Sequence, residues 1–330
     1  MPWKQGYTIS DERSLTDSEL RWPDGAGCCV AMTVDLSVAS GPEGITAADL
    51  TTPEALFGAN QGLAALREVL RRHAMRATFA VPAVIAHTHR DLVRSLTDEG
   101  HEIAAHGFRH EDVSGLERDE ERQRIVRTTE ILADVTGGKP AGWFSLPRQG
   151  DRYAVGAVSP NTVDLLLDAG YLYLGNGLAD DIPHYWVSDF ASRRALLTLP
   201  YYYHFDDQFF LMFPRKGTGL EHPDALLRNW RGEFAAQYRR GRYFHMTLHP
   251  QHIGWSNRLQ MLEEFLAELR GYPGLWNPTA TECARYWLEA YPASAHLRLA
   301  PTIWQEPRQP QLTSGGGAGK RQYHPGLEVI

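Results

Sequence analysis

The chain of 330 residues has only three cysteines, Cys28, Cys29 and Cys283. Their spacing forms neither a disulfide framework nor a metal-binding motif, which suits a reducing compartment. The first residues, Met-Pro-Trp-Lys-Gln-Gly, also lack the apolar core of a secretory signal. We therefore expect a cytoplasmic protein.

Long apolar runs and an excess of positive charge are missing as well. No run approaches the roughly 20 residues that span a bilayer, so we expect no membrane partner. Lys and Arg number 33 against 40 Asp and Glu, a net charge of −7, which offers no basic surface for nucleic acid. No Gly-x-Gly-x-x-Gly follows the first predicted strand, and this excludes a two-domain dehydrogenase. A small molecule remains the expected partner.

The chain does contain an alternation of strand-like and helix-like segments. With 43% hydrophobic and 22% charged residues it is an ordinary globular protein, and its length fits two domains or one large barrel. Apolar runs predict buried parallel strands, and periodic segments predict helices. The strands are expected at 28–34, 77–81, 101–105, 142–146, 171–174, 195–199 and 243–248, and the helices at 61–74, 84–98, 116–135, 160–169, 223–239, 255–269 and 279–290. Such repeats form an α/β fold with helices outside a parallel sheet, open or closed into a barrel.

Both ends of the chain differ in composition from the middle. Residues 1–25 are polar and rich in turn-forming residues, which predicts an N-terminal arm on the body. Residues 293–330 form a Pro/Gly-rich tail, which predicts disorder or a docked arm. The folded domain is therefore expected at 26–292.

The most informative stretch is 100–112, which contains His106 and His110 directly after a short apolar run. On one helical turn this spacing stacks two imidazoles on the same face. Two neutral imidazoles placed in this way can share one divalent metal, usually zinc. Paired histidines can also be surface residues or core hydrogen bonders. Here Gly107 between them and the acids that follow favour a site.

Four polar residues follow apolar, strand-like runs: Asp35, His106, Ser145 and His249. The carboxyl ends of parallel strands meet at one edge of a sheet, where α/β proteins place their chemistry. We therefore expect Asp35, His106, His110 and His249 to converge on one cavity.

Several motifs occur in order between about residues 15 and 292. They are Arg21-Trp-Pro-Asp-Gly-Ala, Thr33-Val-Asp35, His101-Glu-Ile-Ala-Ala-His-Gly-Phe-Arg-His-Glu, Gly142-Trp143, Ser159-Pro-Asn-Thr162, Ala179-Asp-Asp-Ile-Pro183 and Met246-Thr-Leu-His-Pro250. This set resembles the polysaccharide-deacetylase-like family (carbohydrate esterase family 4, or NodB-homology), and within it the cytoplasmic allantoinase-like and peptidoglycan-deacetylase-like branch. The resemblance implies a distorted (β/α) barrel that forms homo-oligomers, dimers or tetramers. It also implies hydrolysis of carbon–nitrogen bonds other than peptide bonds, often with a divalent metal.

The resemblance also assigns roles by position. It implies that Asp35 is the general base, that His106 and His110 are metal ligands, and that His249 protonates the leaving group or polarises the base. This chemistry is consistent, because a metal lowers the pKa of its bound water, a carboxylate removes a proton and a histidine donates one.

Two departures from the family pattern stand close to these residues. Leu36 and Ser37 occupy the positions of the second aspartate, a metal ligand in the family, and serine is a poor replacement beside carboxylate or imidazole. Phe144 follows Gly142-Trp143 where the family has the arginine that orients the base.

These departures leave three alternatives open. The site is weakly metallated or metal-free, or Asp35 itself ligates the zinc while Glu111 or Asp112 shares the acid–base work. The third alternative is a catalytically impaired barrel that acts as a binding or structural protein. Glu111 and Asp112 are also compatible with a solvated loop.

Four more side chains are candidates for substrate binding: Trp143, Arg148, Tyr203 and His252. Tyr203 lies in the aromatic and polar run 201–207, which suits either a substrate loop or a contact with another subunit. Arg148 is a candidate replacement for the missing arginine, Trp143 also suits packing, and His252 also suits the surface. The expected activity is hydrolysis of an amide or cyclic amide in a small substrate.

Overall fold

The computed structural model describes residues 8–9, 15–148, 151, 156–177, 179–189, 192–211 and 223–297. The predicted tail beyond residue 297 and most of the first 14 residues lie outside this part of the chain. Within it, one sheet contains ten strands. They are β1 (Thr8–Ile9), β2 (Cys28–Asp35), β3 (Thr78–Val81), β4 (Glu102–Ala105), β5 (Gly142–Trp143), β6 (Tyr173–Gly177), β7 (His184–Asp189), β8 (Arg194–Pro200), β9 (Tyr243–Leu248) and β10 (Leu275–Trp276).

The central strands run parallel in the order β9-β2-β3-β4-β5-β6-β8. β7 extends the sheet antiparallel to β8, β1 follows β7, and β10 pairs with the start of β2. One parallel bridge, between Asp206 and Thr247, links the segment after β8 to β9. The predicted α/β architecture with parallel strands is confirmed.

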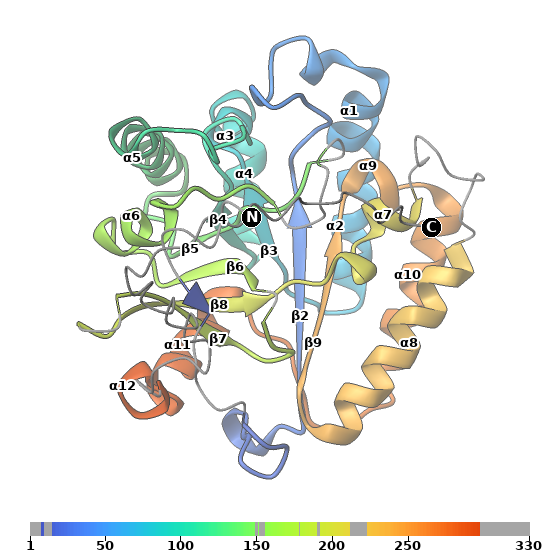
Figure 1. The fold of residues 1–330 in the computed structure, drawn as a ribbon. Helices are drawn as coiled ribbons and strands as arrows, with labels where there is room; N and C mark the ends of the chain where they lie inside the picture. Colours follow the sequence, from blue (N-terminus) through green and yellow to red (C-terminus); the bar gives the residue numbers. More distant parts are fainter. Residues whose placement is uncertain are drawn as a thin grey trace, which may run out of the picture. The chain divides into compact units, whose positions relative to one another are not determined.

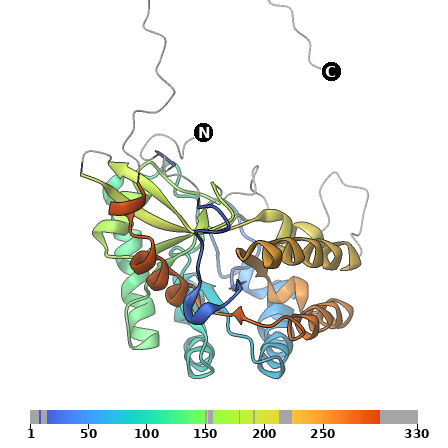
Figure 2. The same cartoon turned by 90° about the horizontal axis from the view of Figure 1, so that it is seen from below.

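Helices surround this sheet (Figures 1 and 2). α8 packs on α10 and α10 on α2, while α5 contacts α3, α4 and α6. In the described ranges, each helix is too short or too polar to cross a bilayer. The helices are α1 (Pro53–Phe57), α2 (Leu63–Arg72), α3 (Ala83–Thr88), α4 (Arg90–Asp98), α5 (Arg118–Thr136), α6 (Thr162–Asp168), α7 (Asp207–Leu211), α8 (Pro223–Arg240), α9 (Pro250–Ile253), α10 (Ser256–Leu269), α11 (Ala280–Ala290) and α12 (Ala293–His296).

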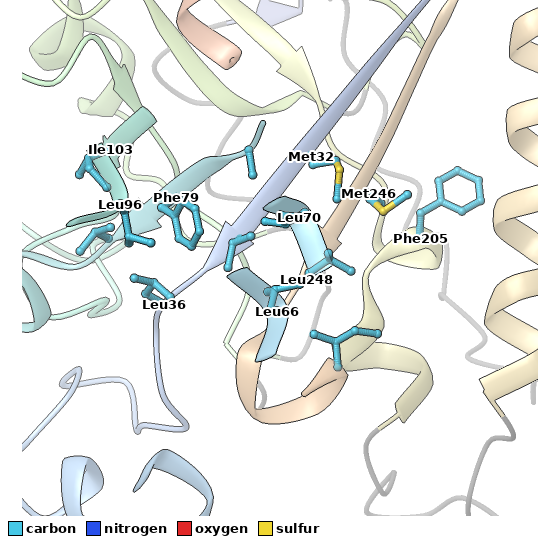
Figure 3. Close-up of a cluster of buried hydrophobic side chains, with 14 of the residues drawn as sticks. Met32, Leu36, Leu66, Leu70, Phe79, Leu96, Ile103, Phe205, Met246 and Leu248 are labelled. Atoms are coloured by element: carbon cyan, nitrogen blue, oxygen red, sulfur yellow. The ribbon is translucent and has the colours of Figure 1, made fainter. Parts of the chain in front are cut away.

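Alternate residues of each central strand enter two different hydrophobic clusters. Met32 of β2 and Met246 of β9 belong to the outer cluster, where they meet Leu66 of α2 (Figure 3). Cys29 and Ala31 of β2 point the other way, into an inner cluster that also contains residues of α11. Because successive side chains of a strand face opposite sides, this pattern fixes which positions face inward.

The N-terminal region contributes to the inner cluster. Trp22 is buried, its ring centroid lies 5.8 Å from that of Trp287 of α11, and its indole N–H donates to the carbonyl of Gly241. The described residues 15–25 of the predicted arm therefore pack into the body. The described residues up to Leu297 belong to one compact unit.

Some predicted elements differ in extent. The expected helix 84–98 is divided into α3 and α4, because His89 leaves helical backbone angles. The expected strand 142–146 pairs only over Gly142–Trp143, and residues 144–148 continue as an extended segment beside the histidine loop. A capping box formed by Thr279 and Glu282 begins α11.

A π-helical turn, η4 (Gly58–Gly62), precedes α2 and rests directly on α9. A Cβ atom on Gly62 would lie 2.2 Å from the carbonyl oxygen of Pro250, and one on Gly254 would lie 2.4 Å from the Cα of Gly62. The two backbones thus touch without intervening side chains. Gly58 and Gly62 of η4 rest on α9 and on Gly254, the residue that follows it, and we call this contact the glycine seam. α9 begins directly after His249.

Gly62→Ala should destabilise the protein by about 1–3 kcal/mol, because the added methyl group meets backbone atoms that cannot rotate away. Gly232→Ala is the matched control: it lies inside α8, a Cβ there meets no atom within 4 Å, and the helix should gain about 0.5–1 kcal/mol. Urea unfolding followed by circular dichroism measures both. Equal midpoints for the two variants would show that the seam is not closely packed.

Candidate active site

Three polar side chains that face inward lie at the carboxyl ends of strands in the parallel sheet. Asp35 is the last residue of β2, while His106 and His249 directly follow β4 and β9. Ala31 and Ala104 lie in the inner cluster, and the two-residue repeat of a strand carries the same direction on to Asp35 and His106. The strand alternation therefore aims these side chains at one region, as the sequence predicts.

The carboxylate of Asp35 lies between two imidazoles. Its Oδ2 is 3.4 Å from Nε2 of His106 and 3.3 Å from Nε2 of His249. Asp35 is 0% exposed and both histidines are 1% exposed, so water does not solvate this group. The three facing atoms have no hydrogen-bond partner, whereas the other carboxylate oxygen, Oδ1, accepts the backbone N–H of Ser37 at 2.6 Å. Asp35 Oδ2 is therefore compensated by the two imidazoles through charge rather than through a hydrogen bond, and buried polar atoms without a hydrogen-bond partner call for an explanation.

A loop brings His106 and His110 together. These residues do not form the helical turn that their spacing suggested. Their ring centroids are 4.1 Å apart. Gly107 and His110 both have left-handed backbone angles, with φ of 75° and 58°. The chain therefore turns sharply after β4, and the two rings meet through that turn rather than through helical periodicity.

Burial shifts the pKa of each of these groups toward the value that favours its uncharged form. Only a close charged partner reverses this shift. Burial raises the pKa of Asp35, but His106 and His249 outweigh it and hold the pKa well below its usual value. Burial, followed by the neighbouring His106, lowers the pKa of His110 to about 3. At neutral pH, Asp35 is therefore ionised and His110 is neutral.

Two carboxylates that the sequence analysis did not select stand behind His249. Nδ1 of His249 lies 2.7 Å from Oδ1 of Asp207 and 3.5 Å from Oδ1 of Asp206. Asp206 also accepts a hydrogen bond of 2.7 Å from the hydroxyl of Tyr201. Burial lowers the pKa of His249, but Asp206 and Asp207 outweigh it and hold the pKa well above its usual value, while burial raises that of Asp206 to about 7. The only sequence signal was their place in the run 201–207.

Two sets of side chains are candidates for a metal. In the described part of the chain, Asp206, Asp207 and His249 have ligand atoms all within 4.8 Å of one another. These atoms are already engaged, however, because Asp207 binds His249 and Asp206 binds Tyr201 and the N–H of Gln208. A cation there would have to displace these hydrogen bonds.

The second set is Asp35, His106 and His110. It is less tightly grouped, but Oδ2 of Asp35, Nε2 of His106 and Nδ1 of His110 are buried acceptors without a partner. One carboxylate and two imidazoles form a donor set that zinc prefers. The donor types of these three residues therefore suit a divalent metal, while their ligand atoms are farther apart than those of Asp206, Asp207 and His249.

Glu111 does not join this group. One of its carboxylate oxygens accepts the backbone N–H of Arg109 at 2.5 Å, and the other lies 3.3 Å from the guanidinium of Arg124. Asp112 accepts the N–H of Ser114. These contacts disfavour the acid–base role considered for Glu111 and Asp112. Both carboxylates accept backbone N–H groups of the loop, and that of Glu111 also contacts Arg124 of α5.

Trp143 and Arg148 line a cavity of about 30 Å³ together with His106, His110 and Glu111. The Trp143 indole donates to the hydroxyl of Ser145, and its ring packs edge-on against Tyr171. Arg148 is buried and pairs with Asp151. Trp143 and Arg148 therefore lie beside the histidine loop, and a cavity of this size holds little more than one or two water molecules.

Tyr203 and His252 have opposite environments. Tyr203 is 50% exposed and packs against His204 and Phe209, away from Asp35. His252 is buried, its ring centroid is 5.6 Å from that of His249, and burial lowers its pKa to about 3. His252 is thus adjacent to the site, and Tyr203 stands on the surface.

Comparison with known proteins shows which sequences this chain resembles. The polysaccharide deacetylase family matches residues 52–174, a range that contains both loop histidines. A peptidoglycan deacetylase of Helicobacter pylori is 24% identical over 267 residues, covering 72% of this chain and 87% of that protein. A peptidoglycan deacetylase-like protein of Gibberella zeae is 23% identical over 268 residues, covering 71% of this chain and 77% of its own length.

Solved structures show the same fold. A putative polysaccharide deacetylase from Mycobacterium smegmatis superimposes with a TM-score of 0.71 at 29% identity, over 84% of this chain and 94% of that one. The Puue allantoinase also gives a TM-score of 0.71, at 20% identity, over 85% of this chain and 95% of its own. The predicted fold, a distorted barrel of the polysaccharide deacetylase type, is confirmed by these likenesses.

The opposite pKa shifts of the buried histidines predict different titrations. His249 should stay protonated above pH 7, whereas His110 and His252 should stay neutral between about pH 5 and 8. The pKa of His249 is raised on folding, so its stabilising pairing with Asp207 is lost as the pH rises through the folded-state pKa of His249. Burial also raises the pKa of Asp207, so the pairing is lost again when the pH falls far enough to protonate that carboxylate. Asp207→Asn should therefore cost most stability between these two pKa values.

Nitrogen-15 NMR of the imidazole rings, combined with urea unfolding across the same pH range, measures both effects. A His249 ring that titrates near 6.5 in the unmodified protein would contradict the expected influence of the two carboxylates.

Proposed function

We propose that the chain hydrolyses an amide bond other than a peptide bond in a small substrate, because residues 52–174 match the polysaccharide deacetylase family, whose members hydrolyse such bonds, and its relatives include a peptidoglycan deacetylase. One observation carries this proposal: a buried, ionised carboxylate, Asp35, is contacted on one side by His106 and on the other by His249. A base and an acid about one hydrogen-bond length apart can act on the two ends of one hydrolytic step.

In this proposal Asp35 accepts a proton from the attacking water. His249, protonated at neutral pH, donates the proton on Nε2 to the departing nitrogen. Asp207 holds the opposite ring nitrogen of His249, which fixes the ring orientation and stabilises its positive charge. Asp206 adds a second carboxylate near that nitrogen.

His106 and His110, together with Asp35, are the residues that would hold a divalent metal, with zinc as the expected ion. When bound, such an ion polarises a carbonyl oxygen and lowers the pKa of water. The ring nitrogens opposite to the site already have acceptors, because Nδ1 of His106 lies 3.1 Å from the carbonyl of Phe144 and Nε2 of His110 lies 2.9 Å from that of Leu146. Metal-ligating histidines are held in this manner.

A small substrate is supported by the burial of the site. Asp35, His106 and His249 are at most 1% exposed, so a reacting amide must enter a largely enclosed space. Acetamido compounds, hydantoins, ureides and N-acyl amino acids all contain a bond of the required kind. The cytoplasmic location and the homo-oligomeric state stay predictions from the sequence.

A catalytically impaired binding protein is the second candidate, and Ser37 is the observation that favours it. Ser37 offers a hydroxyl where the family has a ligand carboxylate, and together with Leu36 it lines a separate cavity of about 40 Å³. Its backbone, not its side chain, bonds to Asp35. The two experiments below distinguish the candidates.

Asp35→Asn should lower turnover by about 10²–10⁴-fold, because the amide cannot accept the proton of the attacking water. Glu111→Gln should leave most activity, since that carboxylate is engaged by Arg109 and Arg124. A screen of the four compound classes, followed by kinetics of both variants, measures these effects. If nothing is hydrolysed, or if the Asp35 variant retains full activity, the binding-protein alternative is the better account.

Metal binding should be weaker than in a site with a second aspartate, and Ser37→Asp should therefore raise zinc affinity. His106→Ala should abolish it, because one of three orphaned donors is lost. Competition with a chromophoric chelator measures both variants against the unmodified protein. Tight stoichiometric zinc in the unmodified protein, unchanged by Ser37→Asp, would contradict the expectation.

A further inference from the structure

Arg109 lies where the histidine loop meets the loop that follows β2. Its backbone carbonyl accepts the N–H of Ile45 at 2.7 Å. A Cβ atom on Gly44 would lie 2.9 Å from the Cβ of Arg109, so the arginine rests directly on that glycine. The two loops continue from β2 and β4, the strands that lead to Asp35 and His106. Their junction therefore lies at the same edge of the sheet as the candidate active site.

The guanidinium of Arg109 has no acidic partner among the described residues. Its Nε is buried without a hydrogen-bond partner, and no other arginine in the described ranges has such an atom. Glu111, the closest acid along the chain, is engaged elsewhere: one of its oxygens accepts the backbone N–H of Arg109, and the other lies 3.3 Å from the guanidinium of Arg124. Because Arg109 as a whole is only partly buried, its side chain can be reached from outside.

Two other arginines near the site are already engaged. Arg148 pairs with Asp112 and Asp151, and the guanidinium of Arg258 donates to two backbone carbonyls. An anion that binds to either of these arginines would have to displace the present contacts. An anion that binds to Arg109 displaces no acid of the described chain.

A guanidinium in this state suits a carboxylate. It is always charged at physiological pH, and its planar fork of N–H donors matches the two oxygens of a carboxylate. A partly buried charge without a partner costs free energy, and a bound anion offsets that cost. The hydroxyl of Ser40, on the same loop as Gly44, is also buried without a partner and is a second donor in these loops. The acids Glu111 and Asp112 of the histidine loop disfavour a doubly charged phosphate there.

We propose that Arg109 binds a carboxylate of the substrate, so that the protein hydrolyses small N-acyl compounds that carry a carboxylate in preference to neutral amides. The inference rests on the proposed function and deepens it. Of the four compound classes, it selects N-acyl amino acids and those ureides that bear a carboxylate. Arg109 binds and orients the substrate, while Asp35 and His249 remain the acid–base pair.

The first test is binding of the N-acetyl derivatives of glycine, alanine and leucine, each as the free acid and as the uncharged amide. Nitrogen-15 NMR follows the Nε–H signal of Arg109, which is assigned with Arg109→Lys. The free acids should shift this signal, whereas the amides and inorganic phosphate should leave it nearly unchanged. The acetyl methyl proton signal of the same samples reports whether the compounds are hydrolysed.

The second test compares the dissociation constants of the acids for three variants. Arg109→Gln removes the charged hydrogen bonds, so affinity for the acids should fall by about 10–100-fold. Arg109→Lys keeps the charge without the fork and should lose less. Arg127→Gln is the matched control, because it removes one positive charge from α5, where the guanidinium lies 4.6 Å from the ring centroid of Phe108. It should bind the acids like the unmodified protein.

Circular dichroism confirms that each variant is folded before its affinity is interpreted. Equal affinities for acids and amides, a silent Arg109 signal with every acid, or a larger response to inorganic phosphate would overturn the inference. An equal loss in Arg127→Gln would also overturn it, because net charge alone would then explain the binding.

The same samples separate this inference from the proposed function. If the acids bind through Arg109 while the methyl signal stays unchanged, the carboxylate site stands and the hydrolytic function fails for these compounds. If the amides are hydrolysed as fast as the acids, the hydrolytic function stands and the role of Arg109 fails.

Discussion

The rest of the site depends on the buried, ionised carboxylate of Asp35. An ionised group out of contact with water costs several kcal/mol unless partners compensate for it. Here the compensation extends outward: two imidazoles contact Asp35, and two carboxylates contact the far side of His249. The hydroxyl of Tyr201 and backbone N–H groups satisfy those carboxylates in turn. The polar residues of the barrel interior are therefore one connected system.

The alternation of strand faces explains why this system lies inside the barrel. On β2, small or polar inward-facing residues such as Ala31 and Thr33 precede Asp35, while the outward-facing positions carry Met32 and other apolar side chains under the helices. The same division on β4 and β9 leads to His106 and His249. The chemistry of the site thus follows from a packing pattern that the strands need for their own stability.

The sequence predicted the parts of the site that are local and periodic. Apolar runs located β2 and β9, and the residues after those runs, Asp35 and His249, do meet. Asp206 and Asp207 could not be found in this way, because no strand or helix pattern directly precedes them and His249, the partner of Asp207, is 42 residues further along the chain. Only tertiary contacts distinguish them from other acids in an aromatic loop.

The histidine loop shows a second limit of sequence patterns. A spacing of four fits a helical turn, but Gly107 and the left-handed His110 produce a comparable approach of the rings in a loop. Likewise, η4 and the break at His89 leave the hydrophobic period almost unchanged, so periodicity predicts a helix without revealing either irregularity. Spacing indicates which residues can meet, and the backbone conformation decides which atoms face the site.

The glycine seam has a mechanical consequence. Side chains at an ordinary helix contact absorb small displacements by changing rotamers, but Gly62, Gly254 and the carbonyl of Pro250 offer no such freedom. The backbone of η4 is therefore held directly against that of α9, which starts at the residue after His249. A change in the outer turn η4 has to be accommodated by the backbone that places the buried imidazole.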